Sequence, residues 1–499
     1  MGRPGRQQLQ LPKTLLSSEA LEKRLLCRGL HPRWQSDPPA GFAGLALDSR
    51  SVGSGDLFCA ISGTAVDGHE YVAEAARSGA AAAVVERVVP DAAIPQLIVT
   101  DTHAAATHLA SLFSGDPGSR MRLIGITGTN GKTTTAWLAR YLLADLESSA
   151  AIGTLGSVDA AGVVHPGSLT TPGPLELMET LASLSADGVK TVAMEVSSHA
   201  LDQRRVDGLR FDAVVFTSFS REHLEYHPDL AHYLDAKLRI VELLEPDGVC
   251  VVNADEPAWE SLDTGSIRRV SYGFSADADV RAEESRFEPD RSDWLLVTDS
   301  GTARVNLPLP GRFNVQNALA AAAIGLEAGL VPSRVAELLA AAPSVSGRME
   351  VLQTEPVLVL RDYAHTPDSY ERVLGALRED TTGKVFVVFG CGGDRDPGKR
   401  PLMGEIATRY ADLTIVTTDN PRSEDPAGIA EEIVAGQDPA RWEIVLDRRE
   451  AIARAIGLAG LGDVVVLLGK GHETYQIIGQ ERVPFDEASI VTELVAAHD

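Results

Sequence analysis

Residues 125–134, GITGTNGKTT, place glycines, a lysine and threonines in an order that suits phosphate binding. The apolar run from Met121 to Ile126 predicts a buried strand, and apolar residues at helical spacing from Trp137 to Leu142 predict a helix. In such a strand, turn and helix, the backbone N–H groups and the positive end of the helix face an anion. Lys132 would then reach the terminal phosphates, and the hydroxyl of Thr133 can hold Mg²⁺. The stretch therefore predicts a nucleotide-phosphate site.

This stretch departs from the strict P-loop, which has a glycine where the chain has Ile126. Its glycines are instead Gly125 and Gly128. An ordinary glycine-rich turn is the alternative, but Gly-Lys-Thr-Thr at a strand-to-helix junction favours phosphate binding. The residues expected to bind the nucleotide phosphates are Gly128, Thr129, Asn130, Gly131, Lys132, Thr133 and Thr134.

Length and charge limit the class of protein. The chain has 499 residues, which suggests about three domains, and 44% of them are hydrophobic, enough to bury full cores. Its 45 basic and 70 acidic residues give a net charge of −25. So acidic a surface argues against nucleic acid as a partner, and anionic ligands need local basic pockets. Solubility is the simpler reason for the charge.

The cysteines and the apolar runs indicate the compartment. Cys27, Cys59, Cys250 and Cys391 lie far apart in the sequence, so we expect reduced thiols with no disulfide and no zinc site. The first residues contain no apolar segment typical of a signal, and no run approaches roughly 18 apolar residues. We therefore expect a cytoplasmic protein with no membrane insertion.

The order of the apolar runs predicts an α/β protein of three domains. Residues 1–117 should form a small α/β domain with a helix from Val72 to Gly79. Residues 118–343 alternate strand and helix, which predicts a parallel sheet wrapped by helices, interrupted by a hairpin turning at Ser300-Gly301. Residues 344–499 alternate again, as in a Rossmann-like domain. Central strands are expected at 191–196, 211–217 and 248–253.

Polar clusters come directly after these apolar runs. Glu195 and His199 follow one expected strand, and the segment 220–223 follows the next. In the third domain DYAHTPD, GGDRDPGKR, DNPR and GKGHE are placed in the same way. Because ligands of open α/β sheets bind beyond the carboxyl ends of the strands, two such crevices facing each other would make one site. Taken singly, Glu195 could be a solvent carboxylate, and His199 and His223 could be capping residues.

The motifs as a set resemble the Mur ligases of peptidoglycan synthesis. The resemblance runs from about Leu45 to Glu487. It is carried by GTNGKTT, EVSSHALDQRRV, FTSFSREHLEYH, YLDAKLRI, GRFNVQNALAA, SGRME, DYAHTPD, GCGGDRDPGKRPLM, DNPR and GKGHETYQ. It implies ATP-driven amide bond formation through an acyl-phosphate, a small UDP-binding first domain, a central ATPase domain and a third domain that binds the amino acid.

Roles at the reaction centre follow from the resemblance. Lys132 would stabilise charge on the transferring phosphoryl group. Thr133 and Glu195 would hold a first Mg²⁺, and His223 would help with a second. Lys237 matches a position where the family carries a carbamylated lysine, and such a lysine needs a lowered pKa to react with CO₂. A surface lysine on a helix is the alternative. The remaining nucleotide contacts would come from Asn317, Arg348 and Asp362.

The resemblance also assigns two substrate sets. The UDP-N-acetylmuramoyl dipeptide would meet Leu47, Ser49, Thr64, Ala65, Val66, Thr170, Thr171, Ser197, Gln203 and Arg205. The incoming amino acid would meet Arg395, Asp419, Asn420, Pro421, Arg422, Gly469 and Glu473. Relatives with DNPR resemble those that add meso-diaminopimelate, because a guanidinium at Arg422 suits a distal carboxylate. L-lysine and LL-diaminopimelate are the alternatives. We expect a monomer that binds small molecules.

The chain departs from the family pattern at four positions: Leu169, Ser218, Glu222 and Ser346. These put the geometry of the second metal and of the hinge in doubt, not the reaction. A folylpolyglutamate synthase shares the phosphate loop but not DNPR or GKGHE. A non-catalytic nucleotide-binding module is the alternative of a different class, and the presence of Lys132, Glu195 and Lys237 argues against it.

Overall fold

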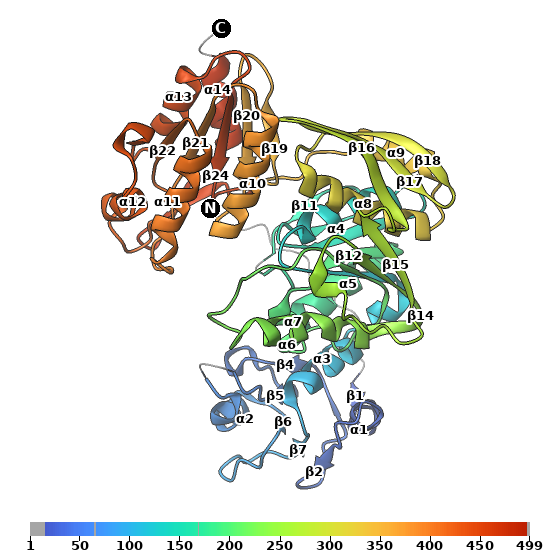
Figure 1. Cartoon of the computed structure of the whole chain (residues 1–499). Helices are drawn as coiled ribbons and strands as arrows, with labels where there is room; N and C mark the ends of the chain where they lie inside the picture. Colours follow the sequence, from blue (N-terminus) through green and yellow to red (C-terminus); the bar gives the residue numbers. More distant parts are fainter. Residues whose placement is uncertain (1–14, 64–65, 168, 497–499) are drawn as a thin grey trace.

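The computed structural model describes residues 15–63, 66–167 and 169–496. Within them three α/β layers follow one another along the chain, from the blue first domain through the central domain to the orange and red third domain (Figure 1). No helix in the described part is both long and apolar enough to cross a membrane. The expected boundaries at 117/118 and 343/344 each fall between two sheets and remain a proposal.

The first domain is built on a sheet of five strands in the order β2-β7-β6-β5-β4, parallel except for β2. The expected helix ends at Ser78, and Gly79 caps it with a φ of +106°, a conformation that glycine adopts without strain. The bounds are β1 Leu16–Ser17, α1 Ser18–Cys27, β2 Arg33–Trp34, β3 Gly41–Phe42, β4 Leu45–Ala46, β5 Leu57–Cys59, α2 Val72–Ser78, β6 Ala82–Val85, β7 Gln96–Ile98 and α3 Thr102–Phe113.

The central domain holds a mixed sheet of eleven strands, in the order β11-β10-β9-β12-β8-β13-β14-β15-β16-β17-β18. In this spatial order the neighbouring strands β9-β12-β8-β13-β14-β15-β16 are parallel, as expected. The strands at both ends of the sheet, β10 and β11 at one and β17 and β18 at the other, pair antiparallel. The strand bounds are β8 Arg122–Thr127, β9 Ser149–Gly153, β10 Gly156–Val158, β11 Val164–His165, β12 Thr191–Glu195, β13 Phe211–Phe216, β14 Leu244–Asn253, β15 Arg268–Gly273, β16 Val280–Glu288, β17 Arg291–Thr298 and β18 Gly301–Leu307. The expected hairpin is β17–β18, but Thr298 pairs with Gly301, so its turn lies one residue earlier than predicted, at Asp299-Ser300.

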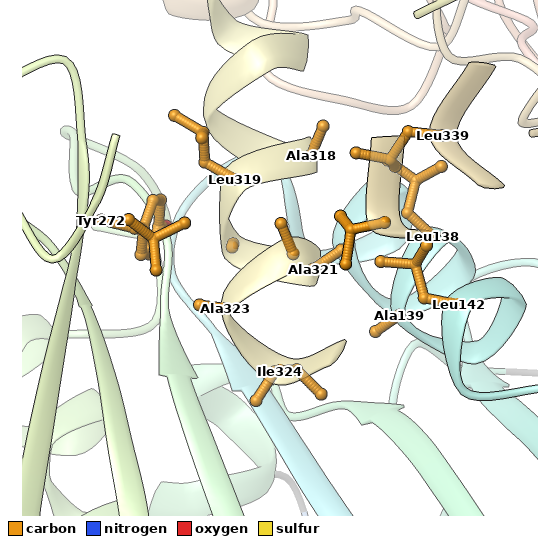
Figure 2. Close-up of a cluster of buried hydrophobic side chains, with 14 of the residues drawn as sticks. Leu138, Ala139, Leu142, Tyr272, Ala318, Leu319, Ala321, Ala323, Ile324 and Leu339 are labelled. Carbon is orange, nitrogen blue, oxygen red and sulfur yellow. The ribbon is translucent and has the colours of Figure 1, made fainter. Parts of the chain in front are cut away.

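The helix that follows the phosphate loop is fixed by an alanine-rich neighbour. Helix bounds in this domain are α4 Lys132–Leu143, α5 Pro174–Ala186, α6 Ser198–Asp202, α7 Leu230–Leu238, α8 Arg312–Glu327 and α9 Pro332–Ala340. Ala318 to Ala323 are fully buried, and Figure 2 shows α8 between Tyr272 on one side and Leu138 and Leu142 of α4 on the other. Small side chains let the two helices approach closely, so α4 is held in place by an apolar core.

The third domain has six strands in the order β19-β20-β24-β21-β22-β23, parallel except for β19. Its bounds are β19 Glu350–Gln353, β20 Leu358–Asp362, α10 Pro367–Asp380, β21 Val385–Phe389, α11 Lys399–Tyr410, β22 Leu413–Val416, α12 Pro426–Val434, β23 Trp442–Ile444, α13 Arg448–Leu458, β24 Val464–Leu468, β25 Tyr475–Ile478, β26 Glu481–Pro484 and α14 Glu487–Ala496. The carboxyl ends of β20, β21, β22 and β24 therefore meet at one edge, where the polar motifs lie.

Candidate active site

The phosphate loop joins β8 to α4 and needs glycine at two positions. Gly128 has a φ of +142° and Gly131 a φ of +89°. A Cβ on Gly128 would lie 1.9 Å from the Thr217 hydroxyl oxygen, and one on Gly131 would lie 2.3 Å from the Asn317 amide oxygen. The loop backbone is thus packed directly against Thr217, which follows β13, and against Asn317 of α8.

Lys132, the first residue of α4, turns back onto its own loop. Its Nζ donates to the carbonyl oxygens of Gly128 at 3.0 Å and Thr129 at 2.8 Å. Burial lowers the pKa of Lys132, and the nearby Glu195 carboxylate opposes that shift. The ammonium group therefore lies inside the loop, where a phosphate oxygen would replace its carbonyl partners.

Lys237 on α7 lies beneath the same loop and is 1% exposed. Its Nζ donates to the Gly128 carbonyl at 2.7 Å and lies 4.4 Å from the centre of the Tyr233 ring. Burial, and next the positive charge of Lys132, hold the pKa of Lys237 well below its usual value. The surface-lysine alternative is therefore wrong, and the amine has the low pKa that carbamylation requires.

Glu195 ends β12 and is 1% exposed. Its Oε1 accepts from the backbone N–H of Thr154 at 2.7 Å, and its Oε2 accepts from the Thr154 hydroxyl at 3.2 Å. A Cβ at Gly153 would lie 2.1 Å from Oε1, so a glycine is needed there. The solvent-carboxylate alternative is wrong, because this carboxylate is enclosed and oriented.

His223 belongs to a cluster of aromatic side chains. Its ring lies 4.8 Å from that of His199, edge to face, and its backbone has a φ of +58°. Burial lowers the pKa of His199 to about 4, with the neighbouring His223 and His227 adding to the shift. Among the described residues no group of three His, Cys, Asp or Glu side chains is arranged to hold a metal by itself. Any Mg²⁺ here would thus need oxygen atoms from substrate, water or a modified Lys237.

A cavity of about 310 Å³ unites the expected nucleotide residues from two domains. The central domain contributes loop residues 129–134, Asn317, Glu195, His223 and Thr170, and the third domain contributes Arg348 and Asp362. Gly128 and Lys237 are not part of its lining; the amine of Lys237 is instead bonded to the Gly128 carbonyl. The cavity also includes Glu222, one of the departures from the family pattern, and residues to which the sequence assigned no role: Thr154, Phe313, Asn314, Tyr363, Ala364, His365, Thr366, Ser369, Arg372 and Val373.

Arg348 connects the third domain to the start of α4. Its Nη2 donates to the Thr133 hydroxyl at 3.2 Å, and its guanidinium lies 4.8 Å from the Tyr363 ring centre. Asp362, at the end of β20, accepts from the backbone N–H groups of Met349 and Ala364, each at 2.7 Å. Burial raises the pKa of Asp362, against the charge of Arg348.

Part of the expected UDP-peptide set is continuous with Glu195. The Thr171 hydroxyl donates to the Glu195 carbonyl at 2.9 Å and accepts from the backbone N–H of Ser197 at 3.0 Å. Arg205 donates to the Thr171 carbonyl at 3.0 Å and to the Gln203 side chain. Thr170 is 3.1 Å from the Thr154 hydroxyl.

The rest of that set lies on the first domain. Leu47 packs against its core, Ser49 is buried and Val66 is exposed. Thr64 and Ala65 lie outside the described residues. Among the described residues, no hydrogen bond or ion pair joins Leu47, Ser49 or Val66 to the Thr171 cluster.

The expected amino-acid residues form a network around a lysine that the sequence reasoning passed over. Lys470 is fully buried, and its Nζ donates to Asp419 at 3.0 Å and to the Asn420 amide oxygen at 3.1 Å. Asn420 in turn donates to Oε2 of Glu473 at 2.8 Å. Lys470 stands inside the GKGHE motif, so the motif itself contained the signal.

Arg422 and Gly469 flank this network. Arg422 has a φ of +51° and donates through Nη1 to the Gly393 carbonyl at 2.7 Å. A Cβ on Gly393 would lie 1.9 Å from the Pro421 carbonyl oxygen, so the two loops are in direct contact. The backbone N–H of Gly469 donates to the Asp362 carbonyl at 3.1 Å. Arg395 is exposed and only borders the group.

The loop that carries Lys470 and Gly471 also contacts the segment around Gly347, where the third domain begins. A Cβ on Gly347 would lie 2.4 Å from the carbonyl carbon of Gly471, and one on Gly471 would lie 2.5 Å from the Tyr363 Cβ. The His472 and Tyr363 ring centres are 5.2 Å apart. Tyr363 therefore stands between the nucleotide cavity and the loop that carries Lys470.

Comparison with known proteins places the chain. The profile of the Mur ligase middle domain matches residues 126–325, that of the Mur ligase glutamate ligase domain matches 347–471, and that of the Mur ligase family catalytic domain matches 42–113. A Geobacter sulfurreducens protein named UDP-N-acetylmuramoyl-L-alanyl-D-glutamate--2,6-diaminopimelate ligase is 44% identical over 471 residues, covering 89% of this chain and 92% of that protein. The chain belongs to the Mur ligase family. The expected family and its three α/β domains are thereby confirmed.

Solved structures agree with this membership. A structure titled UDP-N-acetylmuramoyl-L-alanyl-D-glutamate--2,6-diaminopimelate ligase matches this Mur ligase with a TM-score of 0.68 and 31% identity, over 93% of this chain and 97% of that one. The folylpolyglutamate synthase of Mycobacterium tuberculosis, solved with ADP and AMPPCP, matches with a TM-score of 0.60 at 19% identity, over 73% of this chain and 92% of its own. That second likeness shows the fold alone.

Proposed function

We propose that this Mur ligase is an ATP-dependent amide ligase that joins meso-2,6-diaminopimelate to UDP-N-acetylmuramoyl-L-alanyl-D-glutamate, a step of peptidoglycan precursor synthesis. The observation that carries the proposal is the meeting of the phosphate loop with the Lys470 network across Tyr363 and Arg348. One side of this junction fits a nucleotide and the other fits a zwitterionic amino acid. The relatives with this name support the choice of substrates.

The first half-reaction makes an acyl-phosphate. The terminal carboxylate of the dipeptide attacks the γ-phosphorus of ATP, the bond to the bridging oxygen breaks, and ADP leaves. Lys132 would release the carbonyls of Gly128 and Thr129 and donate to the phosphate oxygens, where negative charge is greatest in the transition state. The half-buried position of this ammonium makes its charge more effective than it would be in water.

Thr133, Glu195, His223 and a carbamate on Lys237 are the residues that would hold Mg²⁺. Bound Mg²⁺ supplies neutralisation of charge on the phosphate oxygens. The enclosed carboxylate of Glu195 fits a hard cation, and the hydroxyl of Thr133 becomes available when Arg348 turns to the nucleotide.

The carbamate forms when the neutral amine of Lys237 adds to the carbon of CO₂ and loses one proton. Its lowered pKa supplies the neutral amine, and the loop carbonyl of Gly128 orients it. The product carries a negative charge below the phosphate loop, which is the charge that a metal ligand needs and an ammonium lacks.

In the second half-reaction the amine of the amino acid attacks the acyl carbon, and phosphate leaves from a tetrahedral intermediate. Arg422 would bind the distal carboxylate of diaminopimelate, Glu473 its distal amine, and Arg395 the carboxylate at the reacting end. Oε2 of Glu473 is occupied by Asn420, which leaves Oε1 for the ligand. L-lysine lacks the distal carboxylate, so binding it would leave Arg422 without a partner.

The test is steady-state phosphate release with ATP, the UDP-dipeptide and one of three amino acids. We expect meso-diaminopimelate to exceed L-lysine by ~10⁴-fold in kcat/KM, since a site built around a polar group rejects the analogue that lacks it. Arg422→Ala should remove that preference. Arg449→Ala, which changes an exposed arginine that pairs with Glu493, is the matched control and should keep it. Equal kcat/KM values for L-lysine and meso-diaminopimelate in the unchanged enzyme would overturn the assignment. The kcat/KM for LL-diaminopimelate measures how strongly the enzyme discriminates between configurations at the distal centre.

We further propose a cytoplasmic monomer, because its four free thiols fit a reducing compartment, and the nucleotide cavity and the Lys470 network are each built from one chain. Light scattering of the purified protein should give a mass near 53.0 kDa with and without ligands. A dimer at micromolar concentration would contradict this.

A further inference from the structure

A carboxylate of the third domain reaches the phosphate loop of the central domain. Asp368 lies in the first turn of α10, and its Oδ2 accepts from the Asn130 amide at 3.2 Å and from the Ser220 hydroxyl at 2.9 Å. Asn130 is in the phosphate loop, and Ser220 lies in the loop that follows β13. One carboxylate oxygen of the third domain thus joins the phosphate loop to the loop that follows β13.

Arg372, one helical turn further along α10, makes a second contact of the same kind. Its Nη1 donates to the Ser218 hydroxyl at 3.1 Å. That hydroxyl also accepts from the backbone N–H of Asn130 at 3.1 Å and lies 3.2 Å from the Asn130 carbonyl, to which it donates. A hydroxyl has one donor and two acceptor positions, so Ser218 is completely satisfied here. The hydroxyl at this position, one of the departures from the family pattern, is what links the helix to the loop.

The first turn of α10 is fixed by its N-terminal cap, so it can hold Asp368 and Arg372 in a defined position. Thr366 and Ser369 form a reciprocal capping box, and Pro367 occupies the first turn. Asp368 and Arg372 are four residues apart and so lie on the same face of the helix. Asn130 is therefore gripped at its side chain by one residue and, through Ser218, at its backbone by the other.

We propose that Asp368 and Arg372 are positioning residues that order the phosphate loop when the third domain docks on the central one. The proposal rests on the proposed function for its catalytic reading, but its structural core concerns nucleotide binding alone. The contacts of Asp368 and Arg372 with the central domain form when the third domain docks, and both are lost when the domains separate. The phosphate loop then adopts its binding geometry only in the closed enzyme. Phosphoryl transfer therefore begins only after the third domain has docked.

The test compares Asp368→Ala and Arg372→Ala with Glu371→Ala. Glu371 lies between the two on α10 but pairs with Arg409 inside the third domain, which makes it a matched control. The first readout is the Kd of a fluorescent ATP analogue, which needs no ligase activity. The second is kcat and the KM of each substrate in phosphate release. A melting curve for each variant confirms that it folds.

We expect each test variant to weaken the ATP analogue and lower kcat by about tenfold, the usual effect of losing a hydrogen bond to a charged group. The KM of the UDP-dipeptide should not change, a split that general misfolding would not produce. Asn130→Asp should lose activity, and adding Asp368→Asn should restore part of it, since the pair again has one donor and one acceptor. A change below about threefold in both alanine variants, or an equal loss in Glu371→Ala, overturns the proposal. Absence of ligase activity with intact analogue binding would refute the proposed function and leave the positioning role standing.

Discussion

The Nζ atom of Lys237 lies 2.7 Å from the carbonyl oxygen of Gly128, so a fully buried lysine is bonded to the phosphate loop itself. The same carbonyl accepts from Lys132 at 3.0 Å. Two amines therefore share one oxygen, and their mutual repulsion is part of the reason that the pKa of Lys237 is so low. Conversion of Lys237 to an anion would turn this repulsion into attraction and stabilise Lys132 as an ammonium.

Lys132→Ala should lower turnover by ~10²-fold or more while the protein stays folded, because the charge at the γ-phosphate is lost. Phosphate release and circular dichroism measure the two effects. Arg140→Ala, a change further along α4 whose side chain donates to the Asp159 and Ala160 carbonyls, is the control and should retain most activity. Near-normal turnover of Lys132→Ala would contradict the assigned role.

Lys237→Ala should be nearly inactive and should regain some activity with short carboxylates such as formate or acetate. The group lost is an anion in the active enzyme, and a small anion can enter the space left by the side chain. Intact-protein mass under CO₂ should show the added carbamate in the parent enzyme and not in the variant. A fully active alanine variant, together with no added mass, would end this interpretation.

Lys237→Met should make the protein more stable near neutral pH in buffer free of CO₂ and Mg²⁺. The folded pKa of Lys237 lies well below its unfolded value, so the unfolded chain binds one more proton between those two values. The lysine's contribution to the free energy of unfolding therefore rises with pH through that window and is fully present above the unfolded pKa. Urea unfolding from pH 7 to 10 should show the advantage of methionine shrinking as pH rises, and a constant difference would contradict it.

Lys470→Met should raise the KM for diaminopimelate about tenfold or more and leave the KM for ATP nearly unchanged. Removing the ammonium frees Asn420 and Glu473 to turn and leaves Asp419 buried without its ion pair. Lys470→Met with Asp419→Asn removes both charges and guards against simple misfolding. An unchanged KM for diaminopimelate in both proteins would show that the network does not position the amino acid.

Local patterns predicted the phosphate loop well, because strand, glycine turn and helix are all determined within residues 121–142. The β17–β18 hairpin was also local, and its turn was misplaced by only one residue. The antiparallel strands β10 and β11 were missed, since they are short and Val164 is exposed, which leaves no periodic apolar signal.

Contacts between distant segments were beyond the sequence. Thr154 orients Glu195 from 41 residues away, and Asp368 reaches Asn130 from 238 residues away. The sequence does not indicate the role of Thr154 or Asp368, because a threonine after a strand and an aspartate in the first turn of a helix are common in proteins. The resemblance predicted many of the residues that line the cavity, while the partners that orient them could be found only from the fold.

The close approach of Gly347 and Gly471 gives this enzyme a vulnerable seam. The linker that carries the third domain has no room for even one added carbon where it crosses the loop of the amino-acid network. A drug-like molecule bound at that crossing would keep the central and third domains apart without imitating ATP, the UDP-peptide or diaminopimelate. Because nucleotide binding favours the docked domains in our proposal, such a compound would weaken ATP binding, and ATP would weaken binding of the compound by the same factor.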